Sequence, residues 1–452
     1  MDKGSRYYHK YHLTLTVGQY LLVLVPIFMF VWVLKDAVIN LPIYDDYDAT
    51  LYYLKQYYYE GLGHDRSPLT LLLKQHNEHR ILLSRLVTLA YFNLTDEINF
   101  AHLVYIQNIL LFLLFLFMAR LSRVTLPNNL WMIVIISFSL FNFSSWHTAF
   151  YYSSGIQHYA SFFFAFVCLF FLNKTASYGS LPFLLAILFA FLATYSFGNG
   201  LLVMPAGFLL LWLRDKKRLL IGWIFLTIGF AIIYIYQLQL DHPEGSEFSL
   251  YSFILFLFTY LGSFSFVYPQ SLPLAQVNVV LSLLIGLVML GIWTYLFFTG
   301  YGRRNPLIFS LISFCMVSAL MLAFSRSGFK VAGAITNRYS FFAKCLFIWV
   351  LMASGDHFKW SQRVFRWIAT GVITLWVVTT FNLFPQIKPA QIAKLKEVKD
   401  WQQGKIPYLM PDIPTDHYGD VLLWAQEKGI YQPPTSQELD EMIEELESGF
   451  NN

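Results

Sequence analysis

Charged residues are scarce in this sequence. Of its 452 residues, 13% are Asp, Glu, Lys or Arg, whereas an average soluble domain contains about 25%. The hydrophobic fraction is 57% and the aromatic fraction 19%. This composition excludes a disordered chain, a protein that coats nucleic acid and an ordinary cytosolic enzyme. It predicts an all-α polytopic membrane protein that contacts the lipid bilayer and has no nucleic-acid partner.

Cysteine is scarce as well. The three cysteines, Cys168, Cys315 and Cys345, all lie inside long apolar runs. The sequence contains no Cys-x-x-Cys pair and no other metal-ligand spacing, so it indicates neither a disulfide framework nor a thiolate site. We expect the three side chains to be small buried groups of the interior.

Apolar runs of roughly 15 to 24 residues are long enough to cross the hydrocarbon core of a bilayer. The first run follows three basic residues but lacks a small-residue cleavage site, which predicts a retained span instead of a signal peptide. About eleven transmembrane helices are predicted, at 17–34, 98–119, 126–142, 156–173, 180–196, 200–213, 219–238, 276–299, 306–324, 339–354 and 365–385. An odd number of spans places the two ends of the chain on opposite sides of the membrane.

Basic residues predict the orientation of these spans. One set of short loops contains Arg120, Arg123, Lys174, Arg214, Lys216, Lys217, Arg218, Arg303, Arg304, Lys359, Arg363 and Arg366. The opposite short loops, near 143–155, 197–199 and 239–275, contain no Lys or Arg. Because short cytoplasmic loops are enriched in Lys and Arg, the N-terminus is predicted inside and the C-terminus outside.

The predicted domain organisation places most polar material on the outer side. A transmembrane domain (1–385) contains a first outer loop (35–97) and a middle outer loop (239–275), and a small helical tail (386–452) follows it. The stretch 251–266 is apolar enough to be a twelfth span. Since a crossing there would invert every later loop, we expect an outer-leaflet or re-entrant helix instead.

Three carboxylates open the first outer loop, at Asp45, Asp46 and Asp48. Helix capping would explain one or two of them. Adjacent carboxylates beside a low dielectric raise one another's pKa, which suits a general base, and they also suit a divalent cation such as Mg²⁺ or Mn²⁺. Asp45 and Asp46 are therefore predicted to be catalytic residues or metal ligands, and Asp48 to bind substrate.

A second polar group in this loop consists of His76, Asn77, Glu78, His79 and Arg80. It precedes an amphipathic run that we expect to lie as a helix in the membrane interface. A solvated, charge-paired helix start is one explanation. The spacing of the two histidines disfavours zinc, whereas these residue types suit an anionic headgroup or a sugar hydroxyl.

A third group contains Arg326, Lys330 and Arg338, followed by Tyr339. These basic residues stand in a loop that is predicted to be outside, against the orientation trend. Such charges suit a phosphate, with ordinary lipid-headgroup anchoring as the alternative. Lys344, in the following span, would either reach the surface as an anchor or add a fourth charge to the same pocket.

Further polar residues are predicted on the outer side at His147, Gln157, His158 and Asn199. The Tyr and Trp residues around them are explained by an aromatic belt at the membrane interface. Aromatic rings also stack on sugar faces, so these Tyr and Trp residues together with the four polar ones are candidates for an acceptor groove. The tail carries no catalytic signature.

These features together resemble the GT-C glycosyltransferase superfamily. The segments DDYD, QHNEHRI and SRSGF…NRYS are similar to those of bacterial GT-C-like membrane proteins of surface-polysaccharide loci, and the resemblance covers most of the chain up to about residue 385. It implies that Asp45 or Asp46 acts as base or metal ligand and that Arg338 or Arg326 binds a lipid phosphate. It also implies the bacterial cytoplasmic (inner) membrane, with the active site facing the periplasm. The large soluble C-terminal domain of some members is missing, which argues against an oligosaccharyltransferase.

The expected reaction moves a sugar from a polyprenyl-phosphate-linked donor to a glycan or lipid-linked acceptor, with inversion. Asp45→Asn and Asp46→Asn are expected to abolish transfer and to leave folding intact. Three alternatives remain. They are a flippase or transporter of lipid-linked sugars, which should show charges deep in several spans, an O-antigen-type polymerase or ligase, and a non-enzymatic assembly partner.

Overall fold

The computed structural model of the chain describes residues 3–59, 67–236, 238–239, 248–326, 328 and 330–448, without the side chains of residues 3–16 and 330. The predicted phosphate-binding side chain of Lys330 lies outside the described side chains. The described chain is mostly helical. A short antiparallel hairpin, β1 (Gln75–His76) and β2 (His79–Arg80), pairs Gln75 with Arg80 and His76 with His79.

Several helices are long and apolar enough to cross a membrane. Among the described residues there are seven, or eight if a pair bent by 41° counts as one span. The seven are found in α1 (Lys3–Ala37), α4 (Phe100–Thr125), α7 (Tyr152–Lys174), α10 (Lys217–Ile235), α12 (Leu272–Phe298), α14 (Pro306–Arg326) and α17 (Gln362–Gln402). The bent pair is α5 (Leu130–Leu140) with η3 (Phe143–Ser145) and α6 (Trp146–Phe150). These helices confirm the all-α, multi-pass class.

The other predicted spans are helical too, but they differ from the seven in length or polarity. Two are short apolar helices, α8 (Leu181–Thr194) and η4 with α9 (Gly198–Leu202 and Val203–Leu213). The third, α16 (Asn337–His357), contains the charged residues Arg338, Lys344 and Asp356. An apolar run in a sequence does not separate a short helix packed inside a bundle from a full span. The number eleven and the orientation therefore stay predictions.

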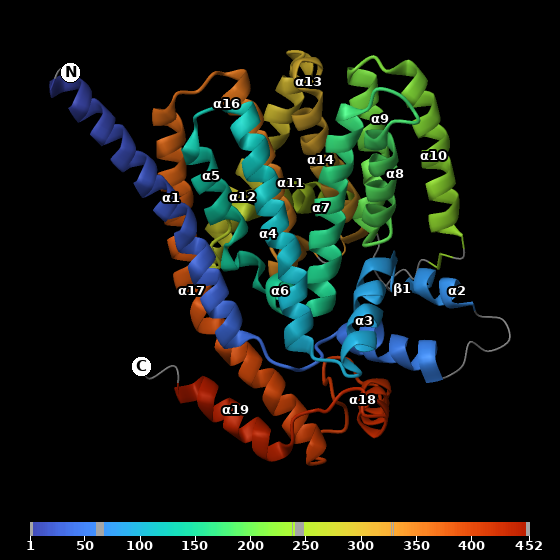
Figure 1. Cartoon of the computed structure of the whole chain (residues 1–452). Helices are drawn as coiled ribbons and strands as arrows, with labels where there is room; N and C mark the ends of the chain where they lie inside the picture. Colours follow the sequence, from blue (N-terminus) through green and yellow to red (C-terminus); the bar gives the residue numbers. More distant parts are fainter. Residues whose placement is uncertain are drawn as a thin grey trace.

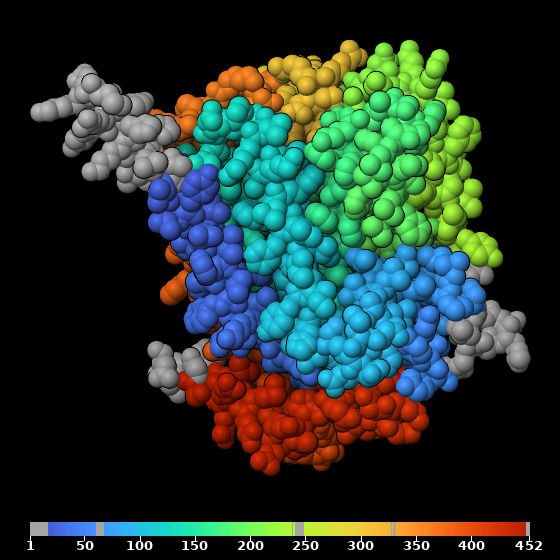
Figure 2. All heavy atoms as spheres, viewed as in Figure 1, coloured from blue at the N-terminus to red at the C-terminus, as the bar shows by residue number. Residues whose placement is uncertain are grey.

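The first outer loop and the tail lie at the same end of the bundle (Figure 1). This end carries α2 (Pro68–Leu73), the hairpin, α3 (Leu82–Thr95), α18 (His417–Glu427) and α19 (Ser436–Ser448). The space-filling view shows the tail covering it as one continuous layer (Figure 2). Because α17 continues past residue 385 to Gln402, one helix connects the bundle directly to the tail. We call this the outer end, after the predicted orientation.

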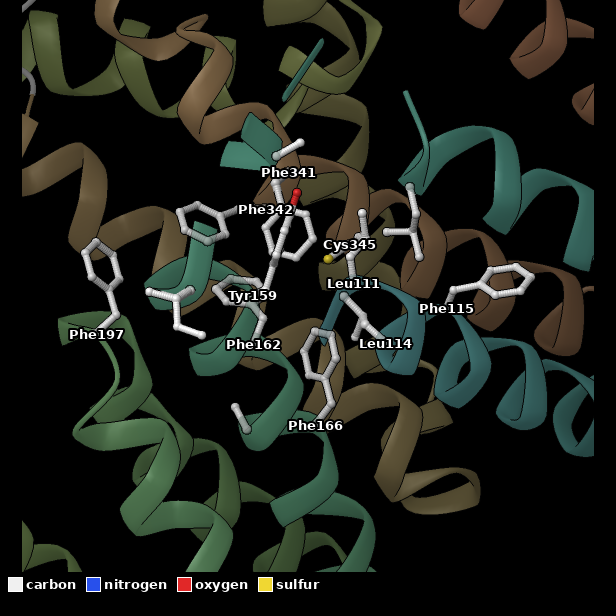
Figure 3. Close-up of a cluster of buried hydrophobic side chains, with 14 of the residues drawn as sticks. Leu111, Leu114, Phe115, Tyr159, Phe162, Phe166, Phe197, Phe341, Phe342 and Cys345 are labelled. Carbon is white, nitrogen blue, oxygen red and sulfur yellow. The ribbon is translucent and has the colours of Figure 1, made fainter. Parts of the chain in front are cut away.

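Aromatic packing fixes the helices that reach the outer end. Rings from α7 and α16 gather in the core shown in Figure 3, where Phe162 stacks on Phe342 with ring centroids 4.5 Å apart. Phe166 meets Trp349 of α16 edge to face at 5.3 Å. Each such pair adds about 0.5–1.5 kcal/mol beyond simple area burial. The core therefore sets the positions of the first turns of α7 and α16.

The apolar stretch at 251–266 does not form one continuous helix. It consists of α11 (Leu250–Leu261) and a short 3₁₀ turn, η5 (Ser263–Ser265), after which the chain leads into α12. The turn lies beside the middle of α12, because Gly262 approaches the backbone of Ser282 and Gly286 approaches that of Phe258. With 12 residues, α11 is too short to span a bilayer by itself.

We predict that Gly286→Ala destabilises the protein. A Cβ at position 286 would overlap the carbonyl oxygen of Phe258, and such overpacking costs about 1–3 kcal/mol. The measurement is thermal unfolding in detergent. The control is Gly291→Ala in the same helix, where an added Cβ has no atom within 4 Å. Equal melting temperatures of the two variants would contradict the close α11–α12 contact.

Candidate functional site

The three polar groups found in the sequence come together at the outer end. Arg326 forms an ion pair with Glu78 across 248 residues of sequence, with 2.7 Å between its Nη2 and Oε2 of Glu78. Asp45 Oδ1 lies 3.9 Å from His76 Nε2 and accepts a hydrogen bond from the Asn77 amide at 3.4 Å. We call these five residues the outer-face cluster. It joins the start of the first outer loop, the hairpin and the end of α14.

The hairpin itself presents three members of this cluster. Asn77 occupies the left-handed region with φ of 47°, which asparagine tolerates better than most residues. The resulting tight turn places His76 opposite His79, with Asn77 and Glu78 at its tip. The sequence had indicated a helix start at this position. The helix begins instead at Leu82, after the hairpin.

Asp46 is a buried structural group. It is 2% exposed. Its Oδ1 accepts hydrogen bonds from the backbone N–H and the hydroxyl of Ser153, at 2.8 and 2.5 Å, and its Oδ2 accepts one from the Ile43 N–H at 3.1 Å. Burial raises the pKa of Asp46 to about 7, against the opposing effect of these bonds. The carboxyl group thereby ties the first outer loop to the first turn of α7.

Asp45, its neighbour, is partly exposed. Its side chain is 46% exposed, and it faces the hairpin instead of α7. A general base must be able to reach the hydroxyl whose proton it removes. Of the two carboxylates predicted to be catalytic, the geometry at Asp45 therefore suits a base better.

The divalent cation predicted at Asp45 and Asp46 would find few oxygen atoms available as ligands. Donor hydrogens from Ser153 and Ile43 point at both oxygens of Asp46, where a metal ion would have to sit. Within the described residues, no three His, Cys, Asp or Glu side chains are placed to hold a metal ion. The residues present at Asp45 and Asp46 do not fit the predicted Mg²⁺ or Mn²⁺ site.

Burial acts on the two histidines of the hairpin. Burial lowers the pKa of His76, and burial followed by the charge of Arg326 lowers the pKa of His79 to about 4. The His79 ring lies 4.2 Å from that of Phe197, whose other contact at 4.8 Å is His158. Both rings of the hairpin are therefore uncharged hydrogen-bonding groups near neutral pH.

Arg80 and Arg85 bind backbone carbonyls. The guanidinium of Arg80 donates to Tyr234 O at 3.0 Å and also to Leu73 O and Tyr236 O. Arg85 donates to the carbonyls at the end of α2, those of residues 71, 72 and 74. Neither arginine pairs with a carboxylate among the described residues.

The remaining predicted residues lie on α6, on η4 and near the starts of α7 and α16. Arg338 is exposed, lies over the ring of Tyr339 at 5.6 Å, and acts electrostatically on His147 and His158. Gln157 and Asn199 are buried, and their side-chain nitrogens have no hydrogen-bond partner among the described atoms.

Lys344 does not reach the surface as an anchor. Its ammonium is buried and donates to Asn142 O at 3.0 Å and to Ser145 Oγ at 2.8 Å. These acceptors lie at the break between α5 and α6, where a helix end leaves carbonyls without partners. Lys344 therefore stabilises the bent pair.

The tail adds contacts that the sequence did not indicate. His417 Nε2 lies 2.7 Å from Asp48 Oδ1, and the two residues are 369 positions apart. Tyr431 is buried and donates through its hydroxyl to the carbonyl of Asn40 at 2.7 Å. On the same side, Lys394 of α17 lies 5.0 Å from the ring of Tyr44 and pairs with Glu397. The tail is thus built into the first outer loop.

A groove of about 850 Å³ adjoins the outer-face cluster. One wall is apolar and comes from α2 and the end of α10, and the other is polar and comes from the hairpin. The lining residues are Leu69, Thr70, Leu73, Lys74, Gln75, Asn77, Arg80, Ile233, Tyr236, Leu238 and Gln239. Asn77 lines this groove and also contacts Asp45, so the groove leads to the exposed carboxylate.

Comparison with protein-family models, with curated proteins and with solved structures gives no significant match. The class of protein is therefore defined by the fold and the site alone. It is an all-α, multi-pass membrane protein with a polar cluster and a groove at one end of its bundle.

We predict that Asp46 makes stability depend on pH. Its pKa in the folded state, about 7, is above the ordinary 3.8, so stability is lost as pH rises from about 4 to about 7, by up to about 1.4 kcal/mol per pH unit. The lowered pKa of His79 acts with the opposite sign. The measurement is therefore the difference in unfolding free energy between the wild type and Asp46→Asn across this range.

A constant difference between the two proteins from pH 4 to pH 7 would contradict this assignment. The burial of Asp46 also revises the expectation that Asp46→Asn leaves folding intact. Removing one partner of a buried hydrogen-bonded carboxyl group costs about 1–3 kcal/mol.

Proposed function

We propose that this protein is a membrane glycosyltransferase of the GT-C type. It moves a sugar from a polyprenyl-phosphate-linked donor to an acceptor hydroxyl at the outer face of a bacterial cytoplasmic membrane. The observation that supports this proposal most is the ion pair of Arg326 with Glu78 beside the exposed Asp45. It brings a phosphate-binding type of residue and a base into one cluster.

In this mechanism Asp45 acts as the base. Its carboxylate accepts the proton of the acceptor hydroxyl while the hydroxyl oxygen attacks the anomeric carbon. The bond from that carbon to the phosphate oxygen breaks, and its electron pair leaves with the lipid phosphate. Attack from the side opposite the leaving group inverts the anomeric configuration.

The leaving phosphate gains negative charge, which Arg326 and Arg338 stabilise in this mechanism. Fixed cations aimed at developing charge are among the largest contributions to catalysis. Arg326 is held by Glu78, so its position is set before the donor binds. The neutral His76 and the amide of Asn77 stand beside Asp45 and suit hydrogen bonds to sugar hydroxyls.

We predict that Asp45→Asn lowers the turnover number by at least about 10²-fold, because general-base catalysis contributes about 10²–10⁴-fold. The assay uses purified protein in nanodiscs, a panel of undecaprenyl-phosphate sugars, and a surface-polysaccharide lipid extract as acceptor. The Asp45 side chain is 46% exposed and asparagine has nearly the same shape, so the melting temperature should change little. Asp420→Asn, an exposed carboxylate of the tail, is the control. Full activity of Asp45→Asn would overturn the mechanism.

A further inference from the structure

The groove beside the outer-face cluster has the volume of a ligand site. Its 850 Å³ falls within the range of about 300–1,000 Å³ that small-molecule sites occupy. Its position is fixed by Arg80, whose guanidinium joins the end of α2 to the last turn of α10. Figure 1 shows α2 and the hairpin at the outer end of α10, where these bonds form.

The apolar wall of the groove continues the lipid-facing surface of α10. Ile233 and Tyr236 line the groove and are largely exposed, and Ile228, Ile232 and Ile235 continue the exposed apolar surface along the same helix. A lipid chain that lies along α10 in the bilayer can therefore enter the groove while staying in contact with an apolar surface. This wall suits an isoprenoid or acyl chain.

The opposite wall suits a phosphate. It carries the ammonium of Lys74, the amides of Gln75 and Asn77, and the guanidinium of Arg80. No carboxylate is among the described residues that line the groove. Among the described residues, the guanidinium of Arg80 is bound by neutral carbonyls and lies over the ring of Tyr234, so its positive charge favours a ligand with negative charge. Lysine is a common phosphate ligand.

The groove and the arginine site involve different residues of the hairpin tip. Asn77 faces the groove and contacts Asp45, whereas Glu78 holds Arg326. A base must touch the acceptor, and Asp45 is next to the groove. The donor phosphate belongs, under the proposed function, to Arg326 and Arg338.

We propose that the groove binds the acceptor and that this acceptor is a phosphate-headed lipid, its phosphate at Lys74 and Arg80 and its chain along Ile233 and Tyr236. This inference rests on the proposed function for the role of acceptor. The protein then has two lipid-phosphate sites, one in the groove and one at Arg326 and Arg338. The acceptor is lipid-linked, in contrast to a free glycan.

The test is native mass spectrometry of the full chain with farnesyl phosphate as the probe. The wild type should bind two molecules. Lys74→Gln and Ile233→Trp should each lose one, because they remove a phosphate ligand and fill the groove. Lys396→Gln, an exposed lysine paired with Glu447, and Ile232→Trp, which is exposed on α10 outside the lining, should still bind two.

Each result decides the assignment. Two bound molecules in both groove variants, or none in the wild type, would overturn it. If inorganic phosphate binds as tightly as farnesyl phosphate and is lost in Lys74→Gln in the same way, the assignment to a lipid would be overturned. The isoprenoid tail of the probe would then contribute nothing to binding. Loss of one farnesyl phosphate in a protein that shows no sugar transfer would support the groove and reject the transferase. If the groove variants still bind two molecules and sugar transfer depends on Asp45, the groove assignment would be rejected and the transferase supported.

Discussion

The outer end of this protein depends on arginine charge that is bound by backbone carbonyls. Arg80 and Arg85 gather the free carbonyls at the ends of α2 and α10, which would otherwise lack partners next to the bilayer. These bonds hold α2 and the hairpin against α10. They also create the groove, because the same guanidinium that joins the two helix ends forms part of its polar wall. The guanidinium of Arg80 thus both fixes the position of the groove and contributes its positive electrostatic potential.

The few charged groups that lie in the interior of the protein are bound by neutral polar groups in two cases. Two buried charged groups bond to polar groups of the backbone and to hydroxyls: Lys344 to Asn142 and Ser145, Asp46 to Ser153 and Ile43. Such neutral partners stabilise the charge without cancelling it. The ion pair of Glu78 with Arg326 is different, because it joins two segments far apart in the chain at a partly exposed position. It positions the cluster more than it stabilises the fold, since exposed pairs contribute about 0–1 kcal/mol.

Periodicity and length in the sequence predicted the helical class and the long apolar helices, because an apolar run must be buried in lipid or protein. The number of spans was not decided by length, since α8 and α9 are apolar but short. The polar groups were found by residue type, but their roles depend on direction. Asp45 and Asp46 are neighbours in sequence, yet one is exposed and one is buried, after a turn in which Tyr44 has φ of 53°. The pairing of Asp48 with His417 is a tertiary contact that leaves no local signal.

The uninterrupted α17 makes the tail mechanically part of the bundle. Pro385 lies inside this helix, which ends at Gln402, so the segment beyond the proline is about 25 Å long at 1.5 Å per residue. A change of about 10° in its direction displaces its far end by about 4 Å. The tail binds Asp48 and Asn40 of the first outer loop. A change in the direction of this helical segment therefore displaces the loop as well. Bilayer thickness, which sets the tilt of long helices, is thereby coupled to the spacing of the groups around Asp45.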